Sequence, residues 1–179
     1  YSVLKPILDA GISGLNFSLH SIDSDELLKT QVDRKIEWMR KQLKQQMQAI
    51  LIAKENSVKV KINTVISSDN DISRIIKIIQ WANSHQIPIR VMNELNSGNQ
   101  AISAANNLFQ SLGAIQTKSE TYMGSSSIRS TFIMPSGEEI GFKYIRPNYL
   151  KTMCTNCNLR NNGCTEKFCY KHFLIKLEY

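Results

Sequence analysis

The first 153 of the 179 residues contain no cysteine; the four cysteines follow at positions 154, 157, 164 and 169. A secreted protein stapled by disulfides would spread its bridges over the fold, so this distribution argues against that class. No apolar run approaches the roughly 20 residues that a membrane-spanning helix needs, and we expect no membrane partner. The chain begins with Tyr1 rather than Met, so we expect it to be part of a longer protein.

The charge is as uneven as the cysteines. Lys and Arg outnumber Asp and Glu by 22 to 15, a net charge of +7, and +5 of it lies within residues 141–179. A basic surface of this kind can bind nucleic acid. Cations beside thiolates, however, lower the thiol pKa and offset the thiolate charge around a metal. We therefore favour a metal or cluster site with an anionic ligand nearby over nucleic acid.

The hydrophobic pattern alternates between helical and strand periods, and apolar residues at 42% are enough for a globular core. It predicts helices over 1–11, 24–54 and 69–85 and strands over 15–23, 58–67 and 87–95. Such alternation gives a parallel sheet, so the fold class is α/β. A short helix over 100–112 and an antiparallel meander over 113–122, 126–134 and 138–145 follow. We place a boundary near residues 98–114.

The cysteine segment, residues 153–169, reads MCTNCNLRNNGCTEKFC, with the spacing Cys-x2-Cys-x6-Cys-x4-Cys. A two-residue spacing lets the thiolates of Cys154 and Cys157 point at one metal, as in zinc knuckles and iron–sulfur sites. Gly163 gives the backbone freedom to bring Cys164 back towards this pair. Zinc, an iron–sulfur cluster and unliganded thiols all stay open from the spacing. Clustered thiols without disulfide spacing indicate a reducing, cytoplasmic compartment.

Polar side chains also mark the expected parallel strands. Ser18, Lys61, Asn63 and Arg90 occupy comparable places on three successive strands. Ligands of α/β proteins bind at the carboxyl ends of the strands, where Lys and Arg suit a carboxylate or phosphate. The alternative is that Lys61 and Arg90 point to solvent at a strand end.

The segments LNFSLHSID, VKINTVI and IRVMNEL resemble, in order and separation, the fourth, fifth and sixth strands of a radical S-adenosylmethionine barrel. The closest pattern is that of the GTP 3′,8-cyclase family of molybdenum-cofactor biosynthesis. The similarity continues through LFQSLGAI, PSGEEIGFKYIRP and the Cys154/Cys157 pair, and CTNCNLRNNGCTEKF is similar to a twitch-type auxiliary domain. The implied fold is the C-terminal half of a partial (β/α) barrel over 1–98. A small antiparallel β meander with a cysteine-rich, cluster-binding tail follows over 99–179.

The resemblance also implies roles for single residues. Ser18 would lie in the S-adenosylmethionine pocket, and Lys61 and Asn63 would face substrate and cofactor respectively. Arg90 would reach the methionyl carboxylate or the substrate. Leu95 stands where the family has a Met that packs on the adenine.

The same resemblance assigns Cys154, Cys157 and Cys164 to an auxiliary [4Fe–4S] cluster, with Cys169 as a fourth ligand or a buried free thiol. The Cys-x3-Cys-x2-Cys loop that binds the catalytic [4Fe–4S] cluster of the family is absent from this sequence. We expect that loop upstream of Tyr1, and we expect these 179 residues alone to be inactive.

Departures from the cyclase pattern affect the substrate. His20 and Asn93 replace an Asp and a Glu of the family, and the terminal Gly-Gly pair is missing. The sequence therefore predicts a radical enzyme that cleaves S-adenosylmethionine and abstracts hydrogen from a small molecule or peptide. Flavodoxin or ferredoxin would donate electrons, and a homodimer stays open. The alternatives are a zinc-stabilised module whose basic tail contacts nucleic acid, and a structural domain with reduced, unliganded cysteines.

Overall fold

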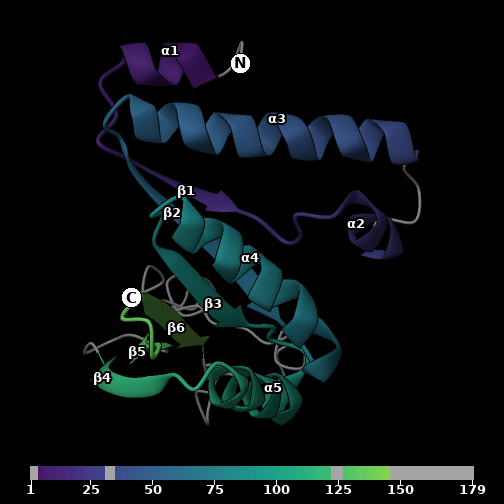
Figure 1. Cartoon of the computed structure of the whole chain (residues 1–179), viewed down its shortest axis with the longest axis vertical. Helices are drawn as coiled ribbons and strands as arrows, with labels where there is room; N and C mark the ends of the chain where they lie inside the picture. Colours follow the sequence, from purple (N-terminus) through teal and green to yellow (C-terminus); the bar gives the residue numbers. More distant parts are fainter. Residues whose placement is uncertain (1–3, 31–34, 122–126, 146–179) are drawn as a thin grey trace, which may run out of the picture.

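The computed structural model describes residues 4–30, 35–121 and 127–145. Its elements alternate along the chain (Figure 1). They are α1 (Leu4–Asp9), β1 (Gly14–Ser18), α2 (Ser24–Thr30), α3 (Ile36–Glu55), β2 (Lys59–Ile66), a 3-10 turn η1 (Asp69–Asp71), α4 (Ile72–Ser84), β3 (Ile89–Asn93), α5 (Gly98–Ser111), β4 (Ile115–Thr121), β5 (Ser127–Ile133) and β6 (Glu139–Ile145). No helix among these residues is both long and apolar enough to cross a membrane.

The described strands form one mixed sheet of six, in the order β1-β2-β3-β6-β5-β4. Strands β1, β2, β3 and β6 run parallel, and β6, β5 and β4 run antiparallel. The α/β class and the antiparallel meander are thus confirmed. The sequence did not predict the pairing of β6 with β3. Because of this pairing, one sheet contains strands from both sides of the boundary that we expected near residue 98. The division into 1–98 and 99–179 stays a prediction.

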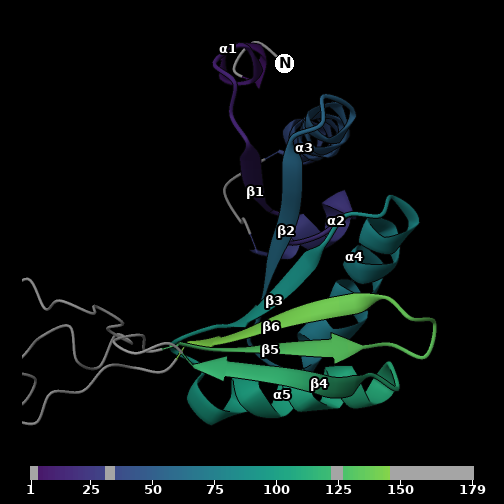
Figure 2. The same ribbon diagram turned by 90° about the vertical axis from the view of Figure 1, so that its left-hand side faces the viewer.

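The helices α3, α4 and α5 lie along one face of this strongly twisted sheet (Figure 2). Strand β2 shows why, because its side chains alternate between buried and half-buried. Val60, Ile62 and Ile66 are buried beneath the helices. Helix α4 meets them with Ile75, Ile78, Ile79 and Ala82, which are buried and spaced for one helical face. The other face of the parallel strands carries Lys61, Asn63 and Arg90.

Aromatic side chains attach α5 to the antiparallel strands. The Phe109 ring stacks on Phe132 of β5, with centroids 3.8 Å apart, and meets Phe142 of β6 edge-on at 5.6 Å. Helix α5 is followed by Gly113, whose φ of +61° is in the left-handed region that glycine adopts without strain. The next amide, of Ala114, donates to the carbonyl of Phe109 and closes the helix end.

Two expected boundaries are wrong. The strand predicted over 15–23 ends at Ser18 because the chain turns to start α2: the Ser21 hydroxyl accepts from the Asp23 amide, and the Asp23 carboxylate accepts from the Asp25 amide. The single helix predicted over 24–54 is two helices. Lys35 is extended, with ψ of 143°, and α3 starts after it. Periodicity alone did not reveal this break.

Candidate functional site

A polar row crosses the face of the sheet opposite α3, α4 and α5, which we call the open face because none of the described helices covers it. In the strand register, Ser18 lies beside Asn63, and Asn63 lies beside Arg90. Arg90 in turn lies beside Gly141 of β6, and Gly141 beside Thr131 of β5. Because paired residues of neighbouring strands point to the same side, these residues share one face. Lys61 points to the same face, two residues before Asn63 and beside Asn16.

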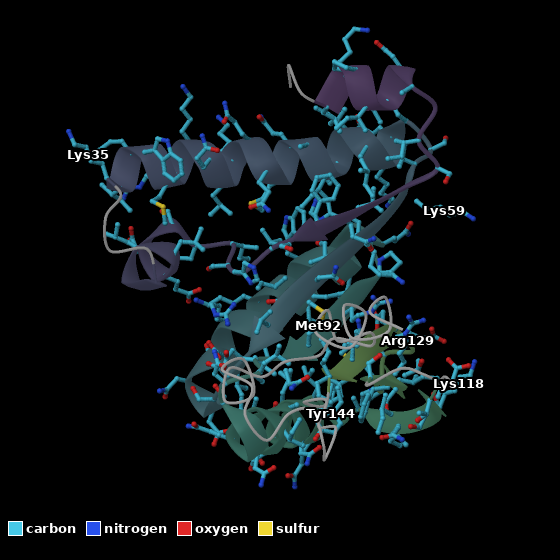
Figure 3. The ribbon with its side chains drawn as sticks, turned by 180° about the vertical axis from the view of Figure 1, so that it is seen from behind. Lys35, Lys59, Met92, Lys118, Arg129 and Tyr144 are labelled. Atoms are coloured by element: carbon cyan, nitrogen blue, oxygen red, sulfur yellow. The ribbon has the colours of Figure 1, made fainter. Side chains whose placement is uncertain are left out.

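Three cations converge on this face. Burial lowers the pKa of the Lys61 ammonium, and the positive charges of Arg90 and Arg129 lower it further. Burial and then the charge of Arg129 also lower the pKa of the Arg90 guanidinium. Arg129 belongs to β5 and can be followed on the rear face of the molecule (Figure 3). Each of these two cations is thus partly desolvated and close to another positive charge, and an anionic ligand would offset both effects.

These side chains surround a cavity of about 270 Å³. Its lining includes Lys61, Arg90, Arg129 and Thr131, together with the carboxyl side chains of Glu120 and Glu139. Gly141 lies between Arg90 and Thr131 in the row, so the absence of a side chain there leaves space beside Arg90. Three cations against two carboxylates leave the lining with a positive charge. Together with the hydroxyls and the space beside Arg90, this charge suits an anionic group.

Asn63 lies in the middle of the row and carries a buried acceptor without a donor. Its Oδ1 is buried, and none of the described residues donates a hydrogen bond to it. An orphaned buried carbonyl is costly, and in native proteins it calls for an explanation such as a bound ligand. The hydroxyl of Ser18 and the cations of Lys61 and Arg90 belong to the same face. The residues present therefore fit a polar ligand that donates to Asn63 and has an anionic group near Arg90.

The structure thus gathers four of the five residues that the resemblance assigned to ligands in the barrel. Ser18, Lys61, Asn63 and Arg90 share the open face. Contrary to our expectation, they do not all lie at the carboxyl edge of the sheet. Ser18 ends β1, whereas Arg90 is the second residue of β3, because the strands are staggered in the register. Leu95 lies apart, in the turn after β3, and is half-buried.

Arg129 and Thr131 were missed by the sequence reasoning. The alternation within SIRSTFI places both residues on one side of β5. That signal does not tell which strand lies next to β5. Only the insertion of β6 between β3 and β5 brings Arg129 towards Lys61 and Arg90.

A second polar cavity, of about 330 Å³, lies at the carboxyl ends of β1 and β2. Its charged groups are already engaged. Asp71 accepts hydrogen bonds from the Ser67 amide and hydroxyl at 2.7 and 2.6 Å, and Arg74 donates to Asp71 at 2.8 Å and to the carbonyl of His20. These contacts tie the loops after β1 and β2 to α4. The cavity is therefore better explained as scaffold than as a ligand site.

Comparison of the chain with protein-family models gives no match, and no curated protein is significantly similar to it in sequence.

The four cysteines, Cys154, Cys157, Cys164 and Cys169, lie outside the described residues, so their ligand roles stay predictions. Within the described ranges, no three His, Cys, Asp or Glu side chains are grouped to hold a metal ion. The described ranges therefore do not indicate a metal site of their own, and the prediction of a metal rests on the cysteine segment.

Proposed function

We propose that this chain is part of a radical S-adenosylmethionine enzyme. Its parallel strands would form half of a partial barrel that holds S-adenosylmethionine and an anionic small molecule or peptide on the open face. The cysteine segment would bind an auxiliary [4Fe–4S] cluster. The substrate and the cyclase-like character of the reaction rest on the sequence resemblance.

The observation that carries the proposal is the row Ser18–Asn63–Arg90, with Lys61 beside it. S-adenosylmethionine has an amine and ribose hydroxyls that can donate to the orphaned Oδ1 of Asn63, and a carboxylate that suits Arg90. When bound and reduced, this cofactor supplies the 5′-deoxyadenosyl radical that abstracts hydrogen from substrate. The half-buried polar residues of this sheet face, which α3, α4 and α5 do not cover, support a ligand layer at this position.

The residues of this chain would bind and position the reactants. Asn63 and Ser18 orient the cofactor by hydrogen bonds, and Arg90 holds a carboxylate. Burial first, and then the charges of Arg90 and Arg129, make the charged form of Lys61 costly, so a bound anion is favoured over an empty site. Positioning of this kind raises the rate by holding the reacting atoms in place.

Anaerobic reconstitution with iron and sulfide tests the cluster. We expect about four iron and four sulfide per chain, with a brown colour and the electron paramagnetic resonance of a reduced [4Fe–4S] cluster. Cys154→Ala, Cys157→Ala and Cys164→Ala should each lower the iron content at least twofold. Stoichiometric zinc without sulfide would contradict the enzyme and support the zinc-stabilised module.

Isothermal titration with S-adenosylmethionine tests the open face separately. Asn63→Ala and Arg90→Met should each weaken binding about tenfold, the loss expected for one hydrogen bond to a polar or charged ligand. Asn106→Ala is the matched control because Asn106 is an exposed asparagine of α5, outside the row. Equal affinities of the three variants would contradict the proposal that S-adenosylmethionine binds to the open face. Reductive cleavage of S-adenosylmethionine by the 179 residues alone would show that the expectation of inactivity is wrong.

A further inference from the structure

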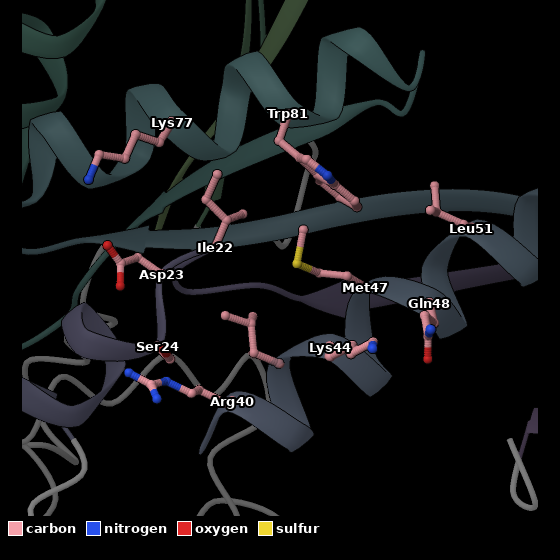
Figure 4. Close-up of a pocket in the computed structure, with 11 residues that line it drawn as sticks. Ile22, Asp23, Ser24, Arg40, Lys44, Met47, Gln48, Leu51, Lys77 and Trp81 are labelled. Carbon is pink, nitrogen blue, oxygen red and sulfur yellow. The ribbon is translucent and has the colours of Figure 1, made fainter. Parts of the chain in front are cut away.

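On the helical side of the sheet, a groove of about 640 Å³ lies between α3 and α4. Leu43, Met47 and Leu51 follow one another at intervals of four residues on α3 and line the groove from one side. Trp81 of α4 and Ile22 of the β1–α2 loop line it from the other side. Figure 4 shows Met47 and Trp81 pointing towards each other across the groove.

This lining is apolar but incompletely covered. Leu43 is buried, whereas Ile22, Met47, Leu51 and Trp81 are partly buried and pack against the core. Met and Trp side chains at an open groove provide a surface that adapts to an apolar partner. The stripe from Leu43 to Leu51 is roughly 12 Å long, which corresponds to about two turns of a docked helix.

The rim of the groove is basic. Arg40 and Lys44 project from α3 and Lys77 from α4, whereas Asp23 is the acidic residue that lines the groove (Figure 4). Lys77 bonds to Glu26 at 2.6 Å, and Arg40 is 3.7 Å from Asp25. Both members of the Arg40–Asp25 pair are more than 60% exposed, so solvent screens that pair and Arg40 can exchange partners. A second copy of this chain would bring the same cations together and be repelled.

We propose that the α3–α4 groove binds an amphipathic helix of an acidic partner protein. The apolar stripe of that helix would cover Met47, Leu51 and Trp81, and its flanking carboxylates would meet Arg40 and Lys44. Recognition of a helix by an apolar groove uses anchors at positions i, i+3, i+4 and i+7, and the charged rim sets partner and orientation. The groove lies on the opposite face of the sheet from the polar row, so this docking is independent of the proposed function.

The test uses the full chain with Trp38→Phe, which leaves Trp81 as the reporter because the sequence has two Trp. The probe is a synthetic helical peptide of about 16 residues with Leu at the anchor positions and Glu at the flanks. The comparison peptide has Lys in place of every Glu. We expect the Glu peptide to shift the Trp81 emission to shorter wavelength and to saturate, with an affinity at least tenfold higher than that of the Lys peptide. Added salt should weaken this binding.

Variants locate the interaction. Arg40→Glu with Lys44→Glu, and separately Met47→Glu, should each weaken binding of the Glu peptide at least tenfold. Lys41→Glu is the matched control because Lys41 is exposed on α3 and does not line the groove. Circular dichroism shows whether each variant is folded. Equal binding of the two peptides, no change at Trp81, or equal effects of Lys41→Glu and the rim variants would overturn the proposal. A dimer that buries Trp81 would overturn it as well, because the groove would then serve self-association.

Discussion

Asn93, the last residue of β3, forms two hydrogen bonds with the backbone of Ile145, the last residue of β6. Its Nδ2 donates to the Ile145 carbonyl at 3.0 Å, and its Oδ1 accepts from the Ile145 amide at 2.7 Å. The ladder of main-chain pairing between these strands ends at Met92 and Lys143. The side-chain amide therefore extends the pairing by one step. This contact joins the parallel strands to the antiparallel ones at the point where the chain leads towards the cysteines.

Asn93→Leu should lower the free energy of unfolding by about 2 kcal/mol. Asn93 is 5% exposed, and leucine there would leave the amide and carbonyl of Ile145 without partners, at the usual penalty for buried unsatisfied groups. Urea denaturation measures the loss, and hydrogen exchange should show faster exchange of the Ile145 amide. Asn106→Leu is the control because Asn106 is exposed. Equal stability of the two variants would show that the contact contributes little.

Lys61→Met should stabilise the protein without ligand, by about 1–3 °C in Tm, because it removes a charge that is partly buried and lies beside Arg90 and Arg129. The folded protein releases the Lys61 proton at lower pH than the unfolded chain does. Wild-type stability should therefore rise relative to the variant as the pH increases from the lowered pKa of Lys61 towards its unfolded value, about 10.4. Thermal scans from pH 7 to 10.5 measure this. Lys59→Met, at an exposed position of β2, is the control. A constant difference at all pH values would contradict the electrostatic explanation.

Gly141→Leu should block the ligand cavity while the protein stays folded. A Cβ at Gly141 would lie 3.5 Å from the Ile89 carbonyl and 3.7 Å from the Arg90 side chain, which are ordinary contacts. Gly141→Ala should therefore be tolerated, whereas the longer leucine would occupy the space beside Arg90. We expect at least a tenfold loss of S-adenosylmethionine or substrate affinity for leucine and under threefold for alanine, measured by isothermal titration. Unchanged binding by a folded Gly141→Leu protein would show that the ligand does not occupy this cavity.

Asp71→Asn should destabilise the protein by about 2 kcal/mol at pH 7, because Asp71 accepts hydrogen bonds from Ser67 and from the Arg74 guanidinium. Burial alone would raise the pKa of Asp71, but these hydrogen bonds lower it overall. The stabilisation is present above the unfolded pKa, about 3.9, and is lost as the pH falls towards the lowered folded pKa. Urea titrations from pH 7 to 2.5 should show the two proteins converging. Asp9→Asn, in an exposed pair with Lys5, should cost under about 0.5 kcal/mol.

Cys169→Ala should retain the iron of the reconstituted protein, whereas Cys164→Ala should lose it. The resemblance places Cys164 third in the ligand set and leaves Cys169 as a fourth ligand or a free thiol. Iron and sulfide analysis distinguishes these roles under identical reconstitution. A loss of iron in Cys169→Ala equal to that in Cys164→Ala would make Cys169 the fourth ligand.

The sequence by itself was sufficient for the α/β class, because helical and strand periods differ and strands separated by helices pair in parallel. It also placed Asn63 and Lys61 on one face of β2, since alternation within KVKINTVI has a period of two. The sequence did not predict the helix break at Lys35, because a continuous helical period does not show where one helix ends and the next begins.

Only the tertiary structure decided which strands are neighbours. Insertion of β6 beside β3 brings Arg129 towards Arg90 and Lys61, which precede it by 39 and 68 positions in the chain. The contact between Asn93 and Ile145 and the groove between α3 and α4 have the same origin. Each depends on packing between elements distant in sequence, and local periodicity describes one element at a time.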